Sequence, residues 1–164
     1  MRMQDGPTVE VDIWVDAAPA RVWELVGDLG LMGEWSPEYQ GGEWLDGATG
    51  PAVGMRFKGR NRRGDREWVS ESTVIESVPG QALAWAVSDP DNAAATWRFD
   101  LQPEGGGTRV REHVRLGPGP SGLTARIAEI PDREEDIVAA RCAEIRRNMQ
   151  ATLEGLKAAA EQGA

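Results

Sequence analysis

A long C-terminal helix is predicted by the stretch Val138-Ala-Ala-Arg-Cys-Ala-Glu-Ile-Arg-Arg-Asn-Met-Gln-Ala-Thr-Leu-Glu-Gly-Leu-Lys-Ala-Ala-Ala160. Its apolar residues recur every three or four positions, the period of a helix face that lies on a core. They are Val138, Cys142, Ile145, Met149, Leu153, Leu156 and Ala160. The first turn of this helix carries three acidic residues, Glu134, Glu135 and Asp136. Negative charge is favoured there by the helix dipole. We therefore expect an unbroken helix from Asp132 onward.

Seven extended segments precede this helix, because alternating apolar and polar residues are typical of half-buried strands. They are Thr8–Val15, Tyr39–Leu45, Gly54–Arg60, Arg66–Glu76, Ala82–Val87, Thr96–Leu101 and Thr108–Leu116. Between the first two, a short helix follows Asp16 as N-cap and a second helical turn covers Leu31–Trp35. Asn61–Asp65 is expected to be a hairpin loop. The pattern of Leu123–Ile130 does not distinguish a helix from a loop.

Composition excludes several classes of protein. With 164 residues, no internal repeat and no linker, we expect a single domain over residues 1–164. A net charge of −9 argues against nucleic acid as a partner. One cysteine, Cys142, excludes a disulfide framework and a thiolate zinc cluster. No apolar run is long enough for a membrane span, and the N-terminus lacks the apolar core of a secretion signal, so we expect a cytoplasmic protein.

This order of elements predicts an α+β fold in which a seven-stranded antiparallel sheet wraps around the long helix. The curvature of such a sheet is wider than one helix, so we expect a cavity between them. The chain has seven tryptophans beside one tyrosine and two phenylalanines. Two interpretations are open: the indole rings build the core, or they line a pocket for a flat apolar ligand.

Five short motifs carry a resemblance to a known family: Ala18-Pro-Ala-Arg-Val-Trp23, Glu34-Trp-Ser-Pro-Glu38, Val78-Pro-Gly80, Gly106-Gly-Thr-Arg-Val110 and Thr152-Leu-Glu-Gly-Leu-Lys157. In this order they resemble the START-like, or SRPBCC, superfamily, and within it the polyketide cyclase/dehydrase and lipid-transport family. The resemblance implies the helix-grip fold and a hydrophobic ligand. Members include aromatase/cyclases, lipid and quinone carriers, hormone receptors and Hsp90-activator relatives, so the fold does not choose the function. It supplies no fixed catalytic motif for this chain.

Glu112 is the candidate catalytic residue. Alternation places it on the same strand face as Val110 and Val114, which is expected to point inward. Burial in an apolar cavity disfavours the charged carboxylate and suits a general acid or base near neutral pH. The competing interpretation is that Glu112 pairs with an arginine across the sheet or lies where the strand leaves the core.

Ligand contacts are predicted from the strands around the expected cavity. In the strand that begins at Arg66, either Trp68, Ser70, Ser72 and Val74 face inward, or Val69, Glu71, Thr73 and Ile75 do. Phe57 and Asn61 share the inward face of the preceding strand. The predicted ligand-binding set is Trp35, Tyr39, Phe57, Trp68, Ser70, Ser72, Trp85, Trp97, Phe99 and Asn148. No metal site and no cofactor is expected.

Other polar features have two interpretations each. His113, the single histidine, alternates outward and is expected at the surface, and Cys142 is expected to be a small buried hydrophobe. Arg62, Arg63 and Arg66 form either a solvated hairpin or a surface for an anionic partner or a carrier protein. Gly117–Pro131 is either a lid over the cavity or an ordinary connection.

The sequence therefore favours a protein that binds a hydrophobic, aromatic or polycyclic small molecule. An enzyme of this kind would be a cofactor-independent cyclase or dehydratase in which Glu112 and a serine such as Ser70 or Ser72 move protons. A non-catalytic carrier and an Hsp90-activator-like interaction module are the alternatives. The excess of arginine over lysine, with abundant alanine and glycine, is typical of a GC-rich bacterial genome.

Overall fold

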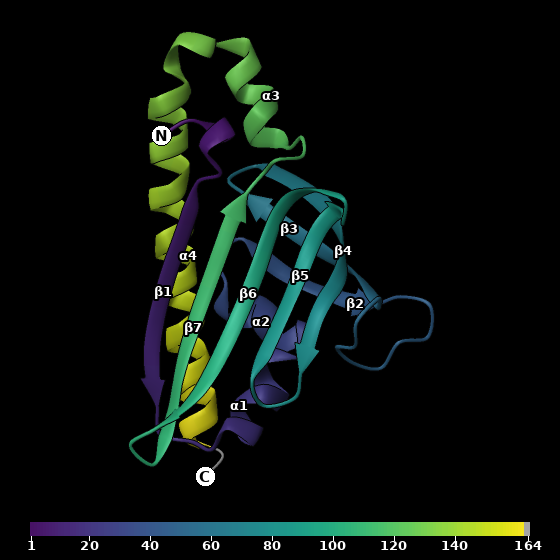
Figure 1. Cartoon of the computed structure of the whole chain (residues 1–164), viewed down its shortest axis with the longest axis vertical. Helices are drawn as coiled ribbons and strands as arrows, with labels where there is room; N and C mark the ends of the chain where they lie inside the picture. Colours follow the sequence, from purple (N-terminus) through teal and green to yellow (C-terminus); the bar gives the residue numbers. More distant parts are fainter. Residues whose placement is uncertain (163–164) are drawn as a thin grey trace.

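The computed structural model describes residues 1–162 and contains one seven-stranded antiparallel sheet (Figure 1). Its strands are β1 (Thr8–Val15), β2 (Tyr39–Trp44), β3 (Arg56–Arg63), β4 (Arg66–Val78), β5 (Ala82–Asp89), β6 (Asn92–Glu104) and β7 (Gly107–Leu116). The α-helices are α1 (Pro19–Val26), α2 (Leu29–Trp35), α3 (Gly122–Glu129) and α4 (Glu134–Gln162), with 3₁₀ turns at Met3–Asp5 and Pro131–Arg133. The strand order β1-β7-β6-β5-β4-β3-β2 confirms the predicted helix-grip architecture.

The two short helices begin elsewhere than the sequence suggests. Asp16 is not the N-cap of α1: the helix starts at Pro19 after Ala18, without a side-chain cap. The Asp16 backbone N–H instead donates to Glu161 of α4, 2.8 Å away. Helix α2 starts two residues before the predicted turn, because the Asp28 carboxylate accepts hydrogen bonds from the N–H groups of Gly30 and Leu31.

Pairing between strands extends beyond their alternating segments. The predicted loop at Asn61–Asp65 is shorter than expected, since β3 and β4 stay paired up to Arg63 and Arg66. Only Gly64 and Asp65 remain in the turn, where Gly64 adopts a φ of 62° that favours glycine. Strand β6 likewise begins at Asn92, because Asn92 and Ala93 pair with the end of β5, and pairing with β7 starts only at Ala95. The ambiguous segment after Ser121 is helix α3, capped by Ser121 and Thr124.

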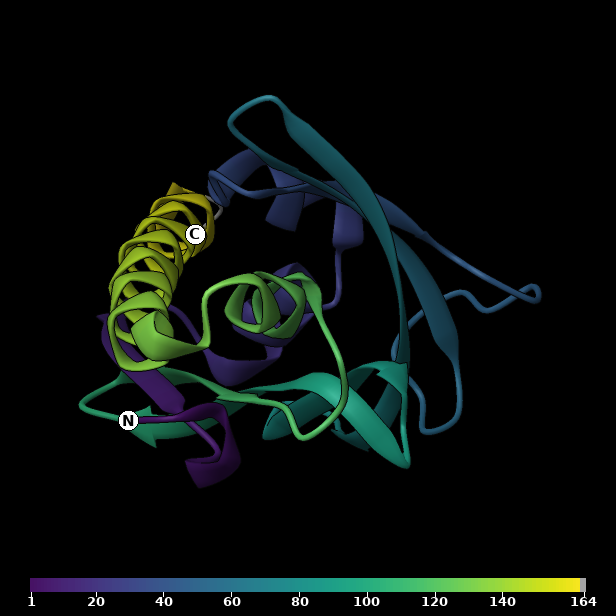
Figure 2. The ribbon, with the colours of Figure 1, turned by 90° about the horizontal axis from the view of Figure 1, so that it is seen from above.

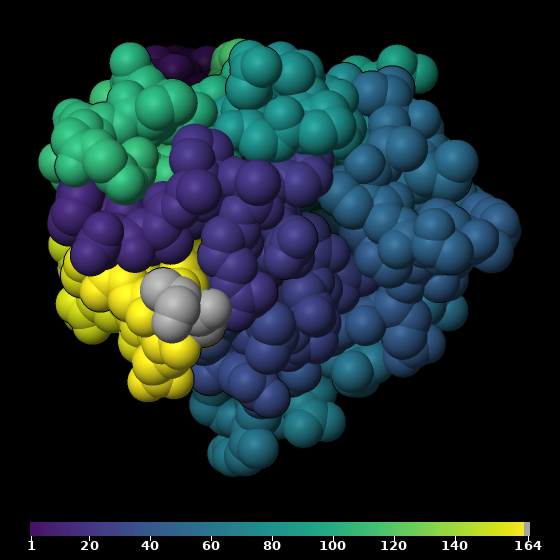
Figure 3. All heavy atoms as spheres, turned by 90° about the horizontal axis from the view of Figure 1, so that it is seen from below, coloured from purple at the N-terminus to yellow at the C-terminus, as the bar shows by residue number. Residues whose placement is uncertain are grey.

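The sheet curls around one side of α4, while α1 and α2 close the gap between the sheet edges (Figures 1 and 2). Figure 3 shows the purple and blue side chains of the first third of the chain covering the lower end. The fully buried residues Phe99, Leu153 and Leu156 belong to the apolar core, together with the inward side chains of α1, β1 and β7. Helix α4 therefore lies on a packed core along its C-terminal half. No helix among residues 1–162 combines the length and apolar character that a membrane span requires.

Candidate functional site

A cavity of about 720 Å³ separates the sheet from the N-terminal half of α4. On α4 the lining residues run from Ile137 to Thr152, whereas Leu153 and Leu156 belong to the packed core. Exposed residues of the lining, among them Arg66 on β4 and Gly122 on α3, lie where the β3–β4 hairpin meets α3. The cavity therefore reaches the surface at this end, and the apolar core closes it at the other.

Aromatic rings form one wall of the cavity. Trp44 and Phe57 meet edge to face with ring centroids 5.4 Å apart, and Phe57 meets Trp85 in the same way at 6.0 Å. Trp85 and Trp97 are stacked, with an interplanar angle of 12° and a centroid distance of 6.5 Å. These four residues of β2, β3, β5 and β6 all line the cavity. The wall presents flat apolar surface to any molecule in the cavity.

Glu112 lies on the inner face of β7 and lines the cavity. It is only 3% exposed, and its Oε2 atom has no hydrogen-bond partner among residues 1–162. Burial alone raises the pKa of this carboxyl to about 8, because no charged group compensates for the loss of water. Within residues 1–162 Glu112 forms no ion pair, so the interpretation that it pairs with an arginine across the sheet is wrong. Glu112 is therefore mostly protonated at neutral pH and can both give and take a proton.

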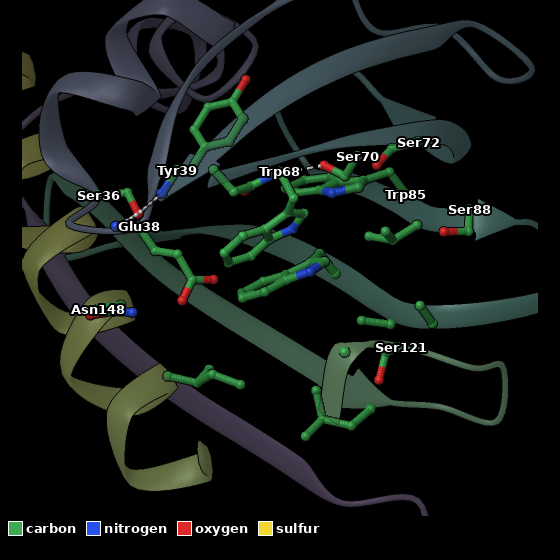
Figure 4. A pocket seen from close by; sticks show the side chains of 18 of the residues that line it. Ser36, Glu38, Tyr39, Trp68, Ser70, Ser72, Trp85, Ser88, Ser121 and Asn148 are labelled. Atoms are coloured by element: carbon green, nitrogen blue, oxygen red, sulfur yellow. Dashed lines mark hydrogen bonds between the residues drawn. The ribbon is translucent and has the colours of Figure 1, made fainter. Parts of the chain in front are cut away.

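The inner face of β4 is settled by the structure. Trp68, Ser70 and Ser72 line the cavity, whereas Glu71 lies on the outer face in an ion pair with Arg56. On β3, Asn61 also lines the cavity and donates a hydrogen bond of 3.1 Å from Nδ2 to the Ser70 hydroxyl. Figure 4 shows Ser70, Ser72 and Trp68 around the same space as Asn148 of α4. A small polar group on an apolar ligand could bind here.

The serines and Glu112 occupy different parts of the cavity wall. Ser72 pairs with Val87 of β5, which is in register with Ala95 and then with Leu116 of β7. Glu112 lies three strands away and four residues along β7 from that row. No hydrogen bond joins Ser70 or Ser72 to Glu112. The serines and Glu112 therefore cannot exchange a proton directly, and any relay between them must pass through the ligand or water.

Eight of the ten predicted ligand-binding residues line the cavity: Tyr39, Phe57, Trp68, Ser70, Ser72, Trp85, Trp97 and Asn148. The other two are corrections. Trp35 packs against α4, where a Cβ on Gly155 would lie only 2.4 Å from its Cγ, so the glycine makes room for the indole. Phe99 is fully buried below the cavity and 5.9 Å from the Trp85 ring. Trp44 and Thr152, which sequence reasoning missed, also line the cavity.

Tyr39 lines the cavity, but its hydroxyl does not point toward the other polar groups of the lining. Figure 4 shows the hydroxyl end of its ring directed away from the other labelled side chains. Its hydroxyl is buried and has no hydrogen-bond partner within residues 1–162, and a Cβ on Gly42 would lie 2.6 Å from it. Burial raises the pKa of Tyr39 to about 12, which Arg60 partly opposes. The phenol is therefore protonated at neutral pH.

A chain of ion pairs links the β3–β4 hairpin to α4 beside the cavity. Arg63 Nε lies 2.6 Å from Glu144, which also pairs with Arg141. Arg141 binds both oxygens of Glu38 at 2.7 and 2.8 Å, and these two side chains are only 16% and 19% exposed. Burial lowers the pKa of Arg141, but the hydrogen bonds and charges of Glu38 and Glu144 outweigh it, so the net shift is upward. Arg63, Glu38 and Arg141 all line the cavity.

The remaining predicted features lie away from the cavity wall or above it. His113 is on the outer face of β7, in register with Glu10 and Arg98. Cys142 is half-buried on α4, and burial raises the pKa of its thiol. Ser121, Leu123 and Arg126, from the connection before and within α3, line the cavity. Figure 2 shows α3 lying across the upper end of the space between α4 and the sheet. Residues 1–162 contain no group of three His, Cys, Asp or Glu side chains placed to hold a metal ion.

Comparison with known proteins assigns this arrangement to a family. Residues 6–161 match the sequence profile of the family described as polyketide cyclase / dehydrase and lipid transport. The chain belongs to this family. The fold of this family and the apolar cavity together suggest that the protein binds a hydrophobic ligand. No curated protein sequence matches the chain.

Solved structures of similar proteins show the same fold. The polyketide cyclase-like protein Cgl2372 from Corynebacterium glutamicum is 29% identical, with a TM-score of 0.66 over 92% of this chain and 88% of that one. The di-domain ARO/CYC StfQ from the steffimycin biosynthetic pathway is 16% identical, with a TM-score of 0.74 over 94% of this chain and 50% of StfQ. Ara h 8.0201 is 14% identical, with a TM-score of 0.62 over 95% and 98% of the two chains.

Proposed function

We propose that this member of the polyketide cyclase/dehydrase and lipid-transport family binds a flat, aromatic or polycyclic small molecule in its cavity and performs acid–base chemistry on it with Glu112. One observation carries the proposal: among the described residues, one buried carboxyl without a partner lines a cavity of about 720 Å³, and aromatic rings form one wall of that cavity. Ligand pockets are typically apolar, of this size, and equipped with few polar groups.

The chemistry that fits one such carboxyl is cyclisation or dehydration of a polyketide-like chain. The carboxylate of Glu112 would remove a proton from a carbon next to a carbonyl. The resulting carboxylic acid would then return that proton to the departing hydroxyl group, which leaves as water while the carbon–carbon double bond forms. One proton moves onto Glu112 and the same proton moves off, so no second acid is required. A pKa of about 8 supports both directions near neutral pH.

The aromatic wall would contribute by positioning. An extended, reactive chain has many conformations, and a rigid apolar cavity favours the few in which the reacting carbons are close. Ser70, Asn61 and Ser72 would hold a carbonyl or hydroxyl of the ligand from the opposite part of the wall. The Glu112 site and the serine site would thus orient a ligand between them.

Kemp elimination of 5-nitrobenzisoxazole tests whether Glu112 is an accessible base. In this reaction a base removes the ring C–H proton, the N–O bond breaks, and coloured 2-cyano-4-nitrophenolate forms. We expect the wild-type rate to rise with pH and level off above about 8. Glu112→Gln should reduce the rate to that of the buffer, whereas Glu71→Gln, which changes a carboxyl on the outer face of the sheet, should leave it intact.

Binding of the neutral fluorophore N-phenyl-1-naphthylamine completes the test. Wild type and Glu112→Gln should bind it alike, because glutamine has nearly the same shape as the protonated acid. Equal binding with equal elimination rates would remove Glu112 from the chemistry and leave a carrier. Absence of probe binding to the wild type would contradict the binding function itself.

A further inference from the structure

The charge of the cavity lining is opposite to that of the whole protein. The protein has a net charge of −9, yet four arginines line the cavity: Arg63, Arg66, Arg126 and Arg141. The lining carboxyls are those of Glu38 and Glu112, and burial keeps Glu112 largely uncharged at neutral pH. Glu129 and Glu144 pair with these arginines from outside the lining, so one positive charge remains in excess at this opening despite the acidic surface elsewhere.

Three of the four arginines have carboxylate partners within the protein. Arg63 pairs with Glu144, Arg141 pairs with Glu38, and Arg126 pairs with Glu129 at 2.8 Å. Arg66 differs from them: among residues 1–162 its side chain forms no ion pair and no hydrogen bond. Its guanidinium donors are therefore available to a molecule in the cavity mouth.

Arg66 is exposed, and two contacts within the protein orient its side chain instead. Its Cζ atom lies 5.5 Å from the centroid of the Trp68 ring, an attractive cation–π arrangement. On its other side it touches α3, where a Cβ on Gly122 would lie only 2.8 Å from its Nη2 atom. An arginine held between a cavity tryptophan and α3 loses little further side-chain entropy when it binds an anion.

We propose that the ligand is an amphipathic anion, with a flat apolar body against the aromatic wall and an oxyanionic group, such as a carboxylate, bound by Arg66 at the cavity mouth. The inference rests on the proposed binding function and adds the ligand's charge and orientation. A charged group deep in the cavity would lose its hydration without a cationic partner near Glu112. At the mouth it stays partly hydrated and meets Arg66, so the neutral end of the ligand points toward Glu112.

A matched pair of probes tests this proposal. 1-Anilinonaphthalene-8-sulfonate and N-phenyl-1-naphthylamine share the same aromatic body and differ by the sulfonate. The variants are Arg66→Gln and, as control, Arg62→Gln, which changes an arginine of the same hairpin that does not line the cavity. We expect Arg66→Gln to weaken sulfonate binding about three- to tenfold and to leave binding of the neutral probe unchanged. Arg62→Gln should alter neither.

Salt supplies an independent readout. Raising the ionic strength should weaken sulfonate binding to the wild type and affect the Arg66→Gln variant much less, since the screened interaction is then missing. Equal loss of both probes in Arg66→Gln would overturn the proposal and make Arg66 a packing residue for Trp68. Unchanged sulfonate binding would also overturn it. Both results leave the binding function intact, whereas failure of both probes to bind the wild type contradicts the binding function and this proposal together.

Discussion

Glu112 on β7 is the direct cross-strand partner of Phe99 on β6, and both side chains lie on the inner face of the sheet. Phe99 is fully buried in the apolar core, while Glu112 lines the cavity immediately above that core. The carboxyl therefore lies at the floor of the cavity, where an apolar ring replaces the water that would otherwise stabilise its charge. This placement raises its pKa and has consequences for stability and ligand binding.

The contribution of Glu112 to the stability of the wild type should fall as the pH rises from about 4.5 to about 8. The pKa of Glu112 is raised from 4.5 in the unfolded chain to about 8 in the folded protein, so the folded state holds the proton more tightly in this window. Its contribution is complete below pH 4.5 and is lost as the pH rises through 8, with a limiting slope of about 1.4 kcal/mol per pH unit.

Urea unfolding of the wild type and Glu112→Gln between pH 4 and pH 9 measures this effect. Because glutamine cannot ionise, the difference in unfolding free energy between the two proteins should shift steadily in favour of the variant as the pH rises. Parallel pH profiles would show that the carboxyl does not have a raised pKa.

Trp97→Leu should weaken binding of N-phenyl-1-naphthylamine by roughly tenfold, because it removes one ring of the stacked Trp85–Trp97 pair from the cavity wall. Trp14→Leu is the matched control, since Trp14 donates its indole N–H to Glu104 and does not line the cavity. Fluorescence titration of both variants checks the prediction. Similar affinities in the two variants would argue that the probe binds elsewhere.

Gly155→Ala should destabilise the protein by about 1–3 kcal/mol, although alanine is ordinarily the better residue in a helix. The new Cβ would lie 2.4 Å from Cγ of Trp35, at the inflexible base of the indole, so α2 must move away from α4. Gly50→Ala, where nothing lies within 4 Å, is the control. Urea denaturation of the two variants is the measurement, and a gain of stability in Gly155→Ala would contradict the close packing.

Arg141→Gln should cost about 1–2 kcal/mol, because it leaves Glu38 and Glu144 half-buried without their shared cation. Arg133→Gln is the comparison. It breaks an exposed ion pair between Arg133, just before α4, and Asp136, in the first turn of α4, and should cost less than about 0.5 kcal/mol. Chemical denaturation compares the two. Equal effects would show that the ion pairs between the hairpin and α4 add nothing beyond an ordinary surface pair.

Local patterns in the sequence predicted most of the elements. The alternation of Thr8–Val15 gives β1 with the predicted ends, and the apolar face of α4 packs against the core as expected. Where tertiary contacts compete with local signals, the prediction was wrong. Asp16 has the side chain of an N-cap, yet its backbone bonds to Glu161, 145 residues away, and α1 starts later. The sequence between Arg63 and Arg66 shows no alternation of apolar and polar residues, yet backbone pairing extends β3 and β4 as far as these two residues.

The sequence by itself determined which residues share a face. Val110, Glu112 and Val114 must point to one side of a strand, and a carboxyl between two valines predicts a buried acid. Only the tertiary structure decided which face of β4 lines the cavity, because Ser70 and Glu71 alternate equally well in either orientation. It also decided which aromatic side chains line the cavity. Trp85 and Trp97 line it, whereas Trp35 packs onto Gly155, since that choice depends on how closely α2 approaches α4 rather than on any local pattern.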